Sequence, residues 1–257
     1  MIRTNYRVSG AGERWVTFVT GIANDLTMWD VQAAALASDC KVLCYDLRGH
    51  GGSETPAGEY TMEMLANDLR DLLDSLSVRK THLVGLGLGG AIAQAFAVRH
   101  QDRLLGLMPC CCRARMVPDF AAMWHQLRET VQQKGLEPIV EPTVQRWFSE
   151  AFKAANPDTL EKVRAMIRGT TREGYLGVTA AFLGLNVEDE LGRIGVPTLY
   201  VSGAEDKLGG PPALMQDLAR RVPGARHVSV PNAAHIANIQ NPAGFNAVLD
   251  GFVREKK

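Results

Sequence analysis

The segment Gly-Leu-Gly-Leu-Gly-Gly at residues 85–90 constrains the fold of this chain more than any other. It follows the apolar run at residues 81–85, which has the composition of a buried strand, and it leads into the alanine-rich stretch at residues 88–100. Because glycine has no Cβ, a glycine-rich junction of this kind predicts a sharp turn from a strand into a helix.

Short apolar runs alternate with amphipathic stretches, which is typical of a mostly parallel sheet wrapped by helices. The runs that we expect to form strands are residues 15–19, 41–45, 81–85, 104–108, 197–202 and 226–230. The stretches that we expect to form the covering helices are residues 60–76, 88–100, 214–222 and 242–253. The helical period is clear in residues 60–76, where five leucines recur at helical spacing after Thr61, a residue type that caps helices.

One region breaks this alternation, because residues 113–185 contain no convincing strand. Helical patterns there cover residues 120–133, 144–154, 159–166 and 173–182. A helical insertion after a central strand is expected to lie over the carboxyl edge of the sheet. We therefore expect an α/β core formed by residues 1–112 and 186–257, and a helical cap formed by residues 113–185. Caps of this kind bury a substrate and exclude water.

A strand–turn–helix junction with the sequence G-x-S-x-G is the nucleophile elbow of the α/β-hydrolase fold, in which the serine stands at the top of the sheet. We therefore expect this fold: a mostly parallel, twisted sheet with helices on both faces. In this chain the middle position is Gly87, so the atom that should attack the substrate is missing. A dinucleotide site fits less well, because the segment is not G-x-G-x-x-G followed by an acidic residue about 20 positions later.

Two residues follow late strands in the order that places the acid and the base of such a site. Asp206 follows the strand expected at residues 197–202, and His235 follows the strand expected at residues 226–230. A carboxylate bound to one imidazole nitrogen fixes the tautomer and leaves the other nitrogen free to accept a proton. We therefore expect Asp206 to orient His235 as the general base beside Gly87.

Two backbone N–H groups are expected to stabilise a negatively charged oxygen at this site. One belongs to Leu88, which follows the nucleophile position, and the other to Ile22, in the loop after the strand at residues 15–19. The helix that begins at Leu88 adds a favourable field for negative charge.

Several segments resemble the 3-oxoadipate enol-lactonases: residues 20–29, 45–53, the elbow, 145–148 and 233–239. The Arg-Gly-His-Gly sequence at residues 48–51 and the histidine loop are common to many α/β-hydrolases. The Asn-Asp-Leu-Thr-Met-Trp and Arg-Trp-Phe sequences are closer to the lactonases.

The resemblance implies hydrolysis of a carboxylated enol-lactone, or a related activated carbonyl compound, in aromatic or heteroaromatic catabolism. It implies the same roles for Asp206, His235, Ile22 and Leu88. It also implies that Trp147 forms a wall of the substrate pocket, although the cap core is an equal alternative for this side chain. It supplies no serine to replace Gly87.

Three further residues of the cap are candidates for substrate contacts. Arg164 and Arg168 could pair with a substrate carboxylate, since arginine binds carboxylates bidentately. A solvated cap surface is the alternative for both. His125 is the third candidate.

The composition limits the class of partner, because 28 Lys and Arg residues balance 28 Asp and Glu residues. This balance argues against a nucleic-acid or anionic-membrane partner. The sequence does not open with a signal peptide and has no run long enough to span a membrane. We expect a cytoplasmic protein, a monomer or small homo-oligomer, that acts on an anionic small molecule without a cofactor or metal.

The five cysteines lack the spacing of a disulfide framework or a zinc site. A substitute nucleophile could come from the adjacent residues Cys110, Cys111 and Cys112. This requires that one thiol have a depressed pKa and lie close to His235.

Three functions are compatible with Gly87. In the first, a water molecule activated by His235 replaces the serine and attacks an activated lactone or ester. In the second, the His–Asp pair serves a non-hydrolytic acid–base reaction, as in an isomerase, lyase or decarboxylase. In the third, the protein is a binding protein or an inactivated variant that has lost its nucleophile.

Overall fold

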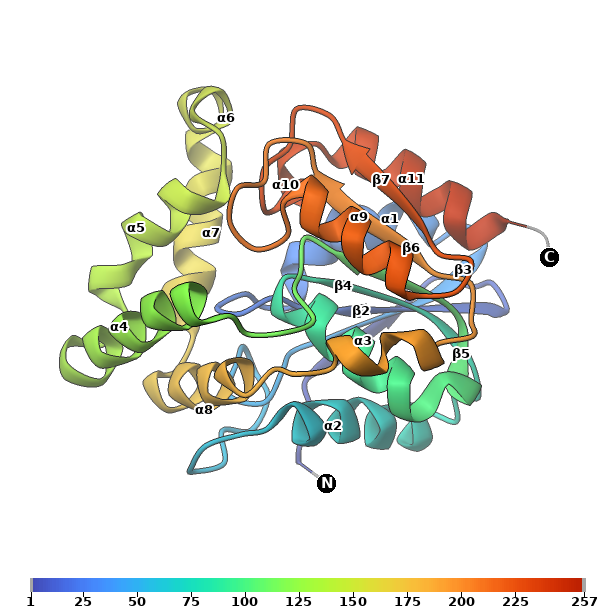
Figure 1. Ribbon diagram of the computed structural model, residues 1–257, viewed down its shortest axis with the longest axis horizontal. Coiled ribbons are helices and arrows are strands. Elements are labelled where there is room, and N and C mark those ends of the chain that lie inside the picture. Colours follow the sequence, from blue (N-terminus) through green and yellow to red (C-terminus); the bar gives the residue numbers. More distant parts are fainter. Residues whose placement is uncertain (1, 256–257) are drawn as a thin grey trace.

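The computed structural model describes residues 2–255 and has the α/β-hydrolase fold expected from the sequence (Figure 1). Seven strands form one sheet in the order β1-β3-β2-β4-β5-β6-β7. The pair β1–β3 is antiparallel, and the remaining pairs are parallel. The strand bounds are β1 Tyr6–Ser9, β2 Arg14–Val19, β3 Cys40–Tyr45, β4 Thr81–Leu86, β5 Leu104–Cys110, β6 Leu199–Gly203 and β7 Arg226–Val230.

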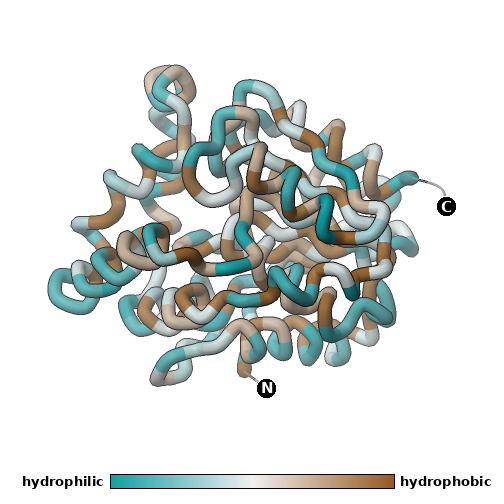
Figure 2. Tube along the Cα trace, in the orientation of Figure 1, coloured by the Kyte–Doolittle hydropathy of each residue, from teal (hydrophilic) through white to brown (hydrophobic). Residues whose placement is uncertain are grey.

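Helices cover both faces of the sheet. On one face α1 (Asp30–Leu36) packs beside α11 (Pro242–Arg254), and on the other α2 (Met62–Ser75) packs beside α3 (Leu88–His100). Helix α9 (Pro212–Arg221) packs on β6 and β7. Hydrophobic residues gather in the central strands and the inner sides of these helices, and hydrophilic residues lie on the outer turns (Figure 2).

The helices α4–α8 stand to one side of the sheet (Figure 1). Along the sequence they follow β5 and precede the 3₁₀ helix η3 (Glu188–Arg193). All five lie within the residues that we expect to form the cap. Their bounds are α4 Pro118–Lys134, α5 Glu137–Trp147, α6 Glu150–Ala155, α7 Pro157–Gly169 and α8 Arg172–Leu183.

The helix expected at residues 144–154 is divided in two. Phe148 has an extended backbone (φ −125°, ψ 152°), and the Oγ of Ser149 accepts the N–H of Phe152 to cap α6. Serine is favoured at an N-cap because its oxygen satisfies an otherwise unpaired N–H. The chain therefore turns at residues 148–149, and this turn faces the core.

Several short elements are absent from the sequence-based prediction. Strand β1 is only four residues long and mostly exposed, and it pairs with β3 at the edge of the sheet. The 3₁₀ helix η1 (Leu26–Trp29) and α1 form a short helical corner after β2, capped by Asp25. A third short helix, α10 (Ala237–Gln240), follows His235.

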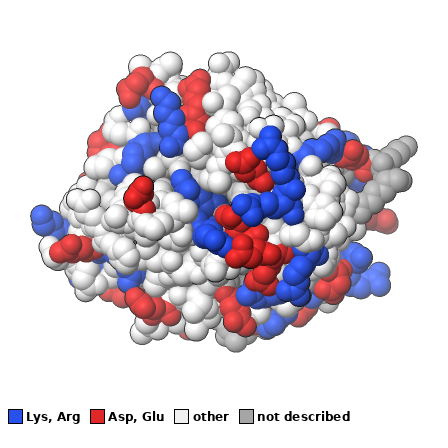
Figure 3. Space-filling model, in the orientation of Figure 1, with Lys and Arg blue, Asp and Glu red and all other residues white. Residues whose placement is uncertain are grey.

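Charges of both signs are interleaved on the face shown in Figure 3. No helix within residues 2–255 is long and apolar enough to cross a membrane.

Candidate active site

Gly87 forms a strained turn between β4 and α3. Its backbone has φ +59° and ψ −119°, a conformation that residues with a Cβ rarely adopt. Its N–H donates to the carbonyl of Cys110 at 2.9 Å, and its carbonyl accepts the N–H of Ala91 at 3.1 Å. The turn has the strand-to-helix geometry of a nucleophile elbow.

The two glycines that flank this position are required by packing. A Cβ on Gly85 would lie 2.2 Å from the carbonyl oxygen of Gly89, and a Cβ on Gly89 would lie 2.3 Å from the carbonyl oxygen of Val19. A Cβ on Gly87 would meet nothing closer than Nε2 of His235, at 3.4 Å, which is ordinary van der Waals contact. A side chain at position 87 would therefore point at the histidine.

Asp206 and His235 form a buried pair. Nδ1 of His235 lies 3.1 Å from Oδ2 of Asp206, and the two residues are 8% and 3% exposed. Burial by itself raises the pKa of the Asp206 carboxyl. The charge and hydrogen bond of His235, with the N–H donors of Leu208 and Gly210, outweigh burial and hold the pKa below its usual value. Asp206 is thus a carboxylate that fixes the orientation of the imidazole.

The loop after β2 places Ile22 in the same cavity as the elbow, and the next residue of this loop is held by a buried histidine. Ala23 has φ +54°, and its N–H donates to Nε2 of His50 at 3.0 Å. Neither Ile22 nor Leu88 donates its N–H in the loop and turn hydrogen bonds of residues 2–255. Both residues line the same cavity as Gly87 and His235, so their N–H groups remain available to an anionic oxygen.

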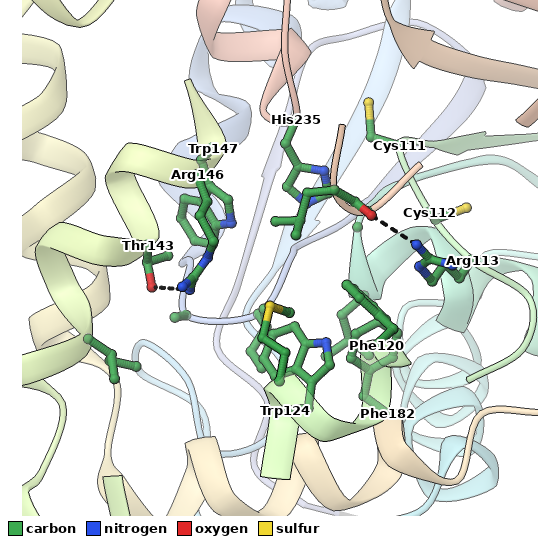
Figure 4. Close-up of a pocket in the computed structure, with 18 of the residues that line it drawn as sticks. Cys111, Cys112, Arg113, Phe120, Trp124, Thr143, Arg146, Trp147, Phe182 and His235 are labelled. Carbon is green, nitrogen blue, oxygen red and sulfur yellow. Dashed lines mark hydrogen bonds between the residues drawn. The ribbon is translucent and has the colours of Figure 1, made fainter. Parts of the chain in front are cut away.

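The cavity above Gly87 has a volume of about 40 Å³, which is room for a few water molecules. Figure 4 shows His235 on one side, Trp147 and Arg146 on a second, and Phe120, Trp124 and Phe182 closing the end opposite the histidine. Phe182 makes edge-to-face contacts with both Phe120 and Trp124. The lining is predominantly apolar, and helices α4, α5 and α8 supply about half of it.

Arg146 is a cation in this cavity without an acidic partner. Its Nη2 donates to Oγ1 of Thr143 at 3.1 Å, and its buried Nε has no hydrogen-bond acceptor. Among residues 2–255 no carboxylate forms an ion pair with it, and burial lowers the pKa of its guanidinium. A half-buried cation in this state favours an anionic ligand.

Arg113 is the other arginine of the cavity, and its Nε is likewise without an acceptor, but its guanidinium is stacked on an aromatic ring. Its Nη2 donates to the carbonyl of Leu208 at 3.1 Å, and its guanidinium lies 4.1 Å from the ring centre of Phe120. Stacking and hydrogen bonding hold this side chain against the wall (Figure 4).

The structure places Arg164, Arg168 and His125 outside the cavity. Arg164 pairs with Glu141, and Arg168 pairs with Glu137 and Glu161 on the cap surface. His125 is exposed on α4. These three side chains therefore do not line the cavity beside Gly87, where we expected them, and surface carboxylates pair with both arginines. Trp147 does line the cavity, with its ring centre 6.4 Å from that of His235.

The three adjacent cysteines are buried. Cys111 and Cys112 line the cavity, and Cys110 is fully buried at the end of β5. Burial raises the pKa of all three thiols, and the nearby Asp206 carboxylate raises those of Cys111 and Cys112 further. A thiolate nucleophile is disfavoured under these conditions.

Sequence reasoning missed Arg146, although the residue lies in the segment 145–148 that carries the enol-lactonase resemblance. The signal that could have identified Arg146 is its place directly before Trp147, which the resemblance assigns to the pocket wall.

A model of the alpha/beta hydrolase fold family matches residues 14–242. The chain is similar to 3-oxoadipate enol-lactonase 2 of Acinetobacter baylyi, with 29% identity over 98% of this chain and 94% of that protein. The crystal structure of the enol-lactonase from Burkholderia xenovorans matches with a TM-score of 0.95 and 32% identity, over 99% of this chain and 97% of that one. A thermophilic esterase from Thermogutta terrifontis, solved with malate bound, matches with a TM-score of 0.93 and 32% identity, over 98% and 93% of the two chains.

Proposed function

This chain belongs to the α/β-hydrolase family, and we propose that it hydrolyses an activated ester or lactone that carries a carboxylate, with a water molecule in place of the missing serine. One observation carries the proposal: the position of a Cβ at Gly87 lies 3.4 Å from Nε2 of His235, with nothing between them. The space that a serine side chain would occupy is open to water beside the base. The enol-lactonases and the esterase among the similar proteins support a carboxylic ester bond as the target.

In the proposed reaction, Nε2 of His235 takes a proton from the water while the water oxygen bonds to the acyl carbon. Asp206 holds the ring and stabilises the imidazolium. The N–H groups of Ile22 and Leu88 stabilise the oxyanion, which then expels the enolate or alkoxide. The proton on His235 passes to the leaving oxygen. An enolate is a good leaving group, so water suffices as nucleophile.

Arg146 is the proposed anchor for the substrate carboxylate. It replaces Arg164 and Arg168 in that role because it lines the cavity and its Nε has no acceptor; Arg113 shares both features but is stacked on Phe120 and bonded to Leu208. Its guanidinium would hold the anion at the cap side of the cavity, while the reacting carbonyl lies near Gly87. The proposed cap, residues 113–185, thus supplies the specificity and excludes water from the reacting centre.

The cavity volume of about 40 Å³ implies that the cap or its side chains move when substrate enters. A lactone ring with a carboxylate side chain is larger than a few water molecules. We expect the aromatic side chains at the end opposite His235 to make this room, since no backbone hydrogen bond holds them.

The test is hydrolysis of 3-oxoadipate enol-lactone and carboxylated aryl esters, followed by mass spectrometry of the enzyme during turnover. We expect steady release of product with no initial burst and no increase in enzyme mass, because no acyl-enzyme forms. An adduct on Cys110, Cys111 or Cys112 would contradict the direct attack by water.

Absence of hydrolysis would also contradict the proposal, and a second measurement then separates the alternatives. Deuterium exchange at the α-carbon of a keto acid, abolished by His235→Ala, would indicate a non-hydrolytic acid–base enzyme. Tight binding without either reaction would indicate a binding protein.

A further inference from the structure

The turn between α5 and α6 in the cap lies against the loop that carries His235 (Figure 1). The carbonyl of Trp147 accepts the backbone N–H of His235 at 3.1 Å and that of Ile236 at 3.4 Å. Trp147 directly follows Arg146. The proposed anion-binding residue and the proposed base are therefore joined by one residue of cap and one hydrogen bond.

Gln240, the last residue of α10, also links the cap turn to the histidine loop through its side chain. Its Oε1 accepts the N–H of Ser149 in the cap at 3.3 Å and the N–H of Ala234 in the histidine loop at 3.2 Å. Its Nε2 donates to Oγ of Ser149 at 2.8 Å and to the carbonyl of Asn232 at 3.1 Å. Two bonds thus reach the cap and two reach the loop.

The side chain of Gln240 is 8% exposed, and this network uses both of its donor hydrogens and both of its acceptor sites. The opposite orientation of the amide would place its NH₂ group against two N–H donors. The hydrogen bonds therefore fix the orientation. An apolar side chain of the same size would fill the space and make none of these connections.

The histidine loop is also bonded to the loop that carries the acid. Glu205 donates its N–H to the carbonyl of Ala233 at 2.8 Å, next to the bond between Asp206 and His235. The two loops therefore move together. A shift of the cap turn carries the acid–base pair with it, relative to Gly87 and the oxyanion N–H groups.

We infer that Gln240 is a positioning residue that couples the binding of a substrate anion in the cap to the placement of His235. The inference rests on the proposed function, because it takes Arg146 as the anion's partner. An anion on Arg146 holds the cap turn in place. Because Gln240 and the Trp147 carbonyl bond this turn to the histidine loop, the position of His235 is then fixed as well. The binding energy of a group remote from the reacting carbonyl then increases kcat.

The kinetic test compares the p-nitrophenyl monoester of glutaric acid, which carries a carboxylate, with p-nitrophenyl pentanoate, which does not. In the wild-type protein we expect kcat for the carboxylated ester to be higher by about 5- to 150-fold, the usual range of coupling between sites. Gln240→Met should bring this ratio close to one, through a loss of kcat for the carboxylated ester with little change in KM. A wild-type ratio near one, or an equal loss for both esters, would overturn the inference.

The matched control is Gln101→Met. Gln101 also bridges distant segments, since its Nε2 donates to the carbonyl of Arg193 at 3.0 Å and its Oε1 accepts the N–H of Gly195 at 2.8 Å. It lies just before β5, at the edge of the sheet opposite the elbow. We expect the kcat ratio of this variant to equal that of the wild type. If Gln240→Met does not fold, Gln240→Glu keeps both bonds to N–H groups and loses the bond to Asn232, so an intermediate ratio is expected.

A second measurement does not depend on turnover. Pentanoate should slow hydrogen exchange at the amides of His235 and Ile236 in the wild-type protein, and pentanamide, which has the same shape without the charge, should not. In Gln240→Met pentanoate should have no such effect. Slowed exchange without hydrolysis would support the coupling and refute the proposed function. Hydrolysis with exchange unaffected by pentanoate would refute the coupling alone.

Discussion

The backbone N–H of Ala23 donates to Nε2 of His50 at 3.0 Å, so the buried imidazole is neutral and carries its proton on Nδ1. Nδ1 lies 3.3 Å from the carbonyl oxygen of Arg48, which accepts a hydrogen bond from the Nδ1–H group. Burial lowers the pKa of His50 to about 4. A protonated ring would present a donor to the N–H of Ala23, next to the proposed oxyanion donor Ile22.

His50 should make the protein less stable in mild acid. Below about pH 6.5 the unfolded chain takes up a proton on this residue, whereas the folded chain does so only below about pH 4. The unfolded state thus binds more protons between these values. The free energy of unfolding should fall as the pH is lowered from 6.5 to 4, by up to about 3 kcal/mol.

Urea unfolding at several pH values between 4 and 7 measures this effect. His50→Gln keeps an acceptor for the N–H of Ala23 but does not titrate, so its free energy of unfolding should change less across the same range. Equal pH dependence of the two proteins would show that another group is responsible.

Replacement of the acid–base pair should remove activity without unfolding the protein. We expect no measurable hydrolysis for His235→Ala. For Asp206→Asn we expect a loss of about 10⁴-fold in kcat, the size seen when a triad histidine is held in the wrong tautomer. His125→Ala is the control, because this exposed histidine lies outside the cavity, and it should retain full kcat.

Replacement of Arg146 should affect acidic substrates selectively. Loss of a charge-assisted hydrogen bond costs about 1.5–3 kcal/mol, so Arg146→Met should lower kcat/KM for a carboxylated ester by roughly 10-fold or more. The neutral ester of similar length should be hydrolysed as before. Arg164→Met and Arg168→Met, which remove surface cations of the same cap, should leave both substrates unaffected; a selective loss in either would return the anion site to the cap surface.

The three glycines of the elbow should differ in their tolerance of alanine. At Gly85 and Gly89 a Cβ would collide with backbone carbonyls, so thermal unfolding should show a large fall in Tm. Gly87→Ala meets no such obstacle and carries only the strain of its φ and ψ, on the order of 1–3 kcal/mol. Gly169→Ala, where a Cβ would meet nothing within 4 Å, should leave Tm unchanged or raise it.

The core of the fold was predictable because its signals are local. Residues 81–100 carry an apolar strand, a glycine turn and an alanine-rich helix in succession, and α3 begins at Leu88 and ends at His100 as expected. Strand β1 was not predictable in the same way, since its residues are exposed and only the pairing with β3 makes it a strand.

In residues 113–185 the sequence predicts helices but not the contacts that their side chains make. The burial of Leu160, Val163 and Ile167 on α7 fixes the face of that helix but does not tell which surface its arginines reach. Arg164 and Arg168 lie opposite acidic residues of other cap segments, and Arg146 faces the cavity because the turn after α5 docks on the histidine loop. That docking joins residues far apart in sequence, and no periodicity within α5 encodes it.

The packing of Gly85 against Gly89 has an evolutionary consequence. These two residues hold the shape of the elbow through close backbone contacts that do not involve a side chain at position 87. In the genetic code, glycine and serine codons differ by a single nucleotide in the GGC–AGC and GGT–AGT pairs. A lineage with this backbone can therefore exchange glycine and serine at position 87 in one mutational step, without rebuilding the fold that surrounds it.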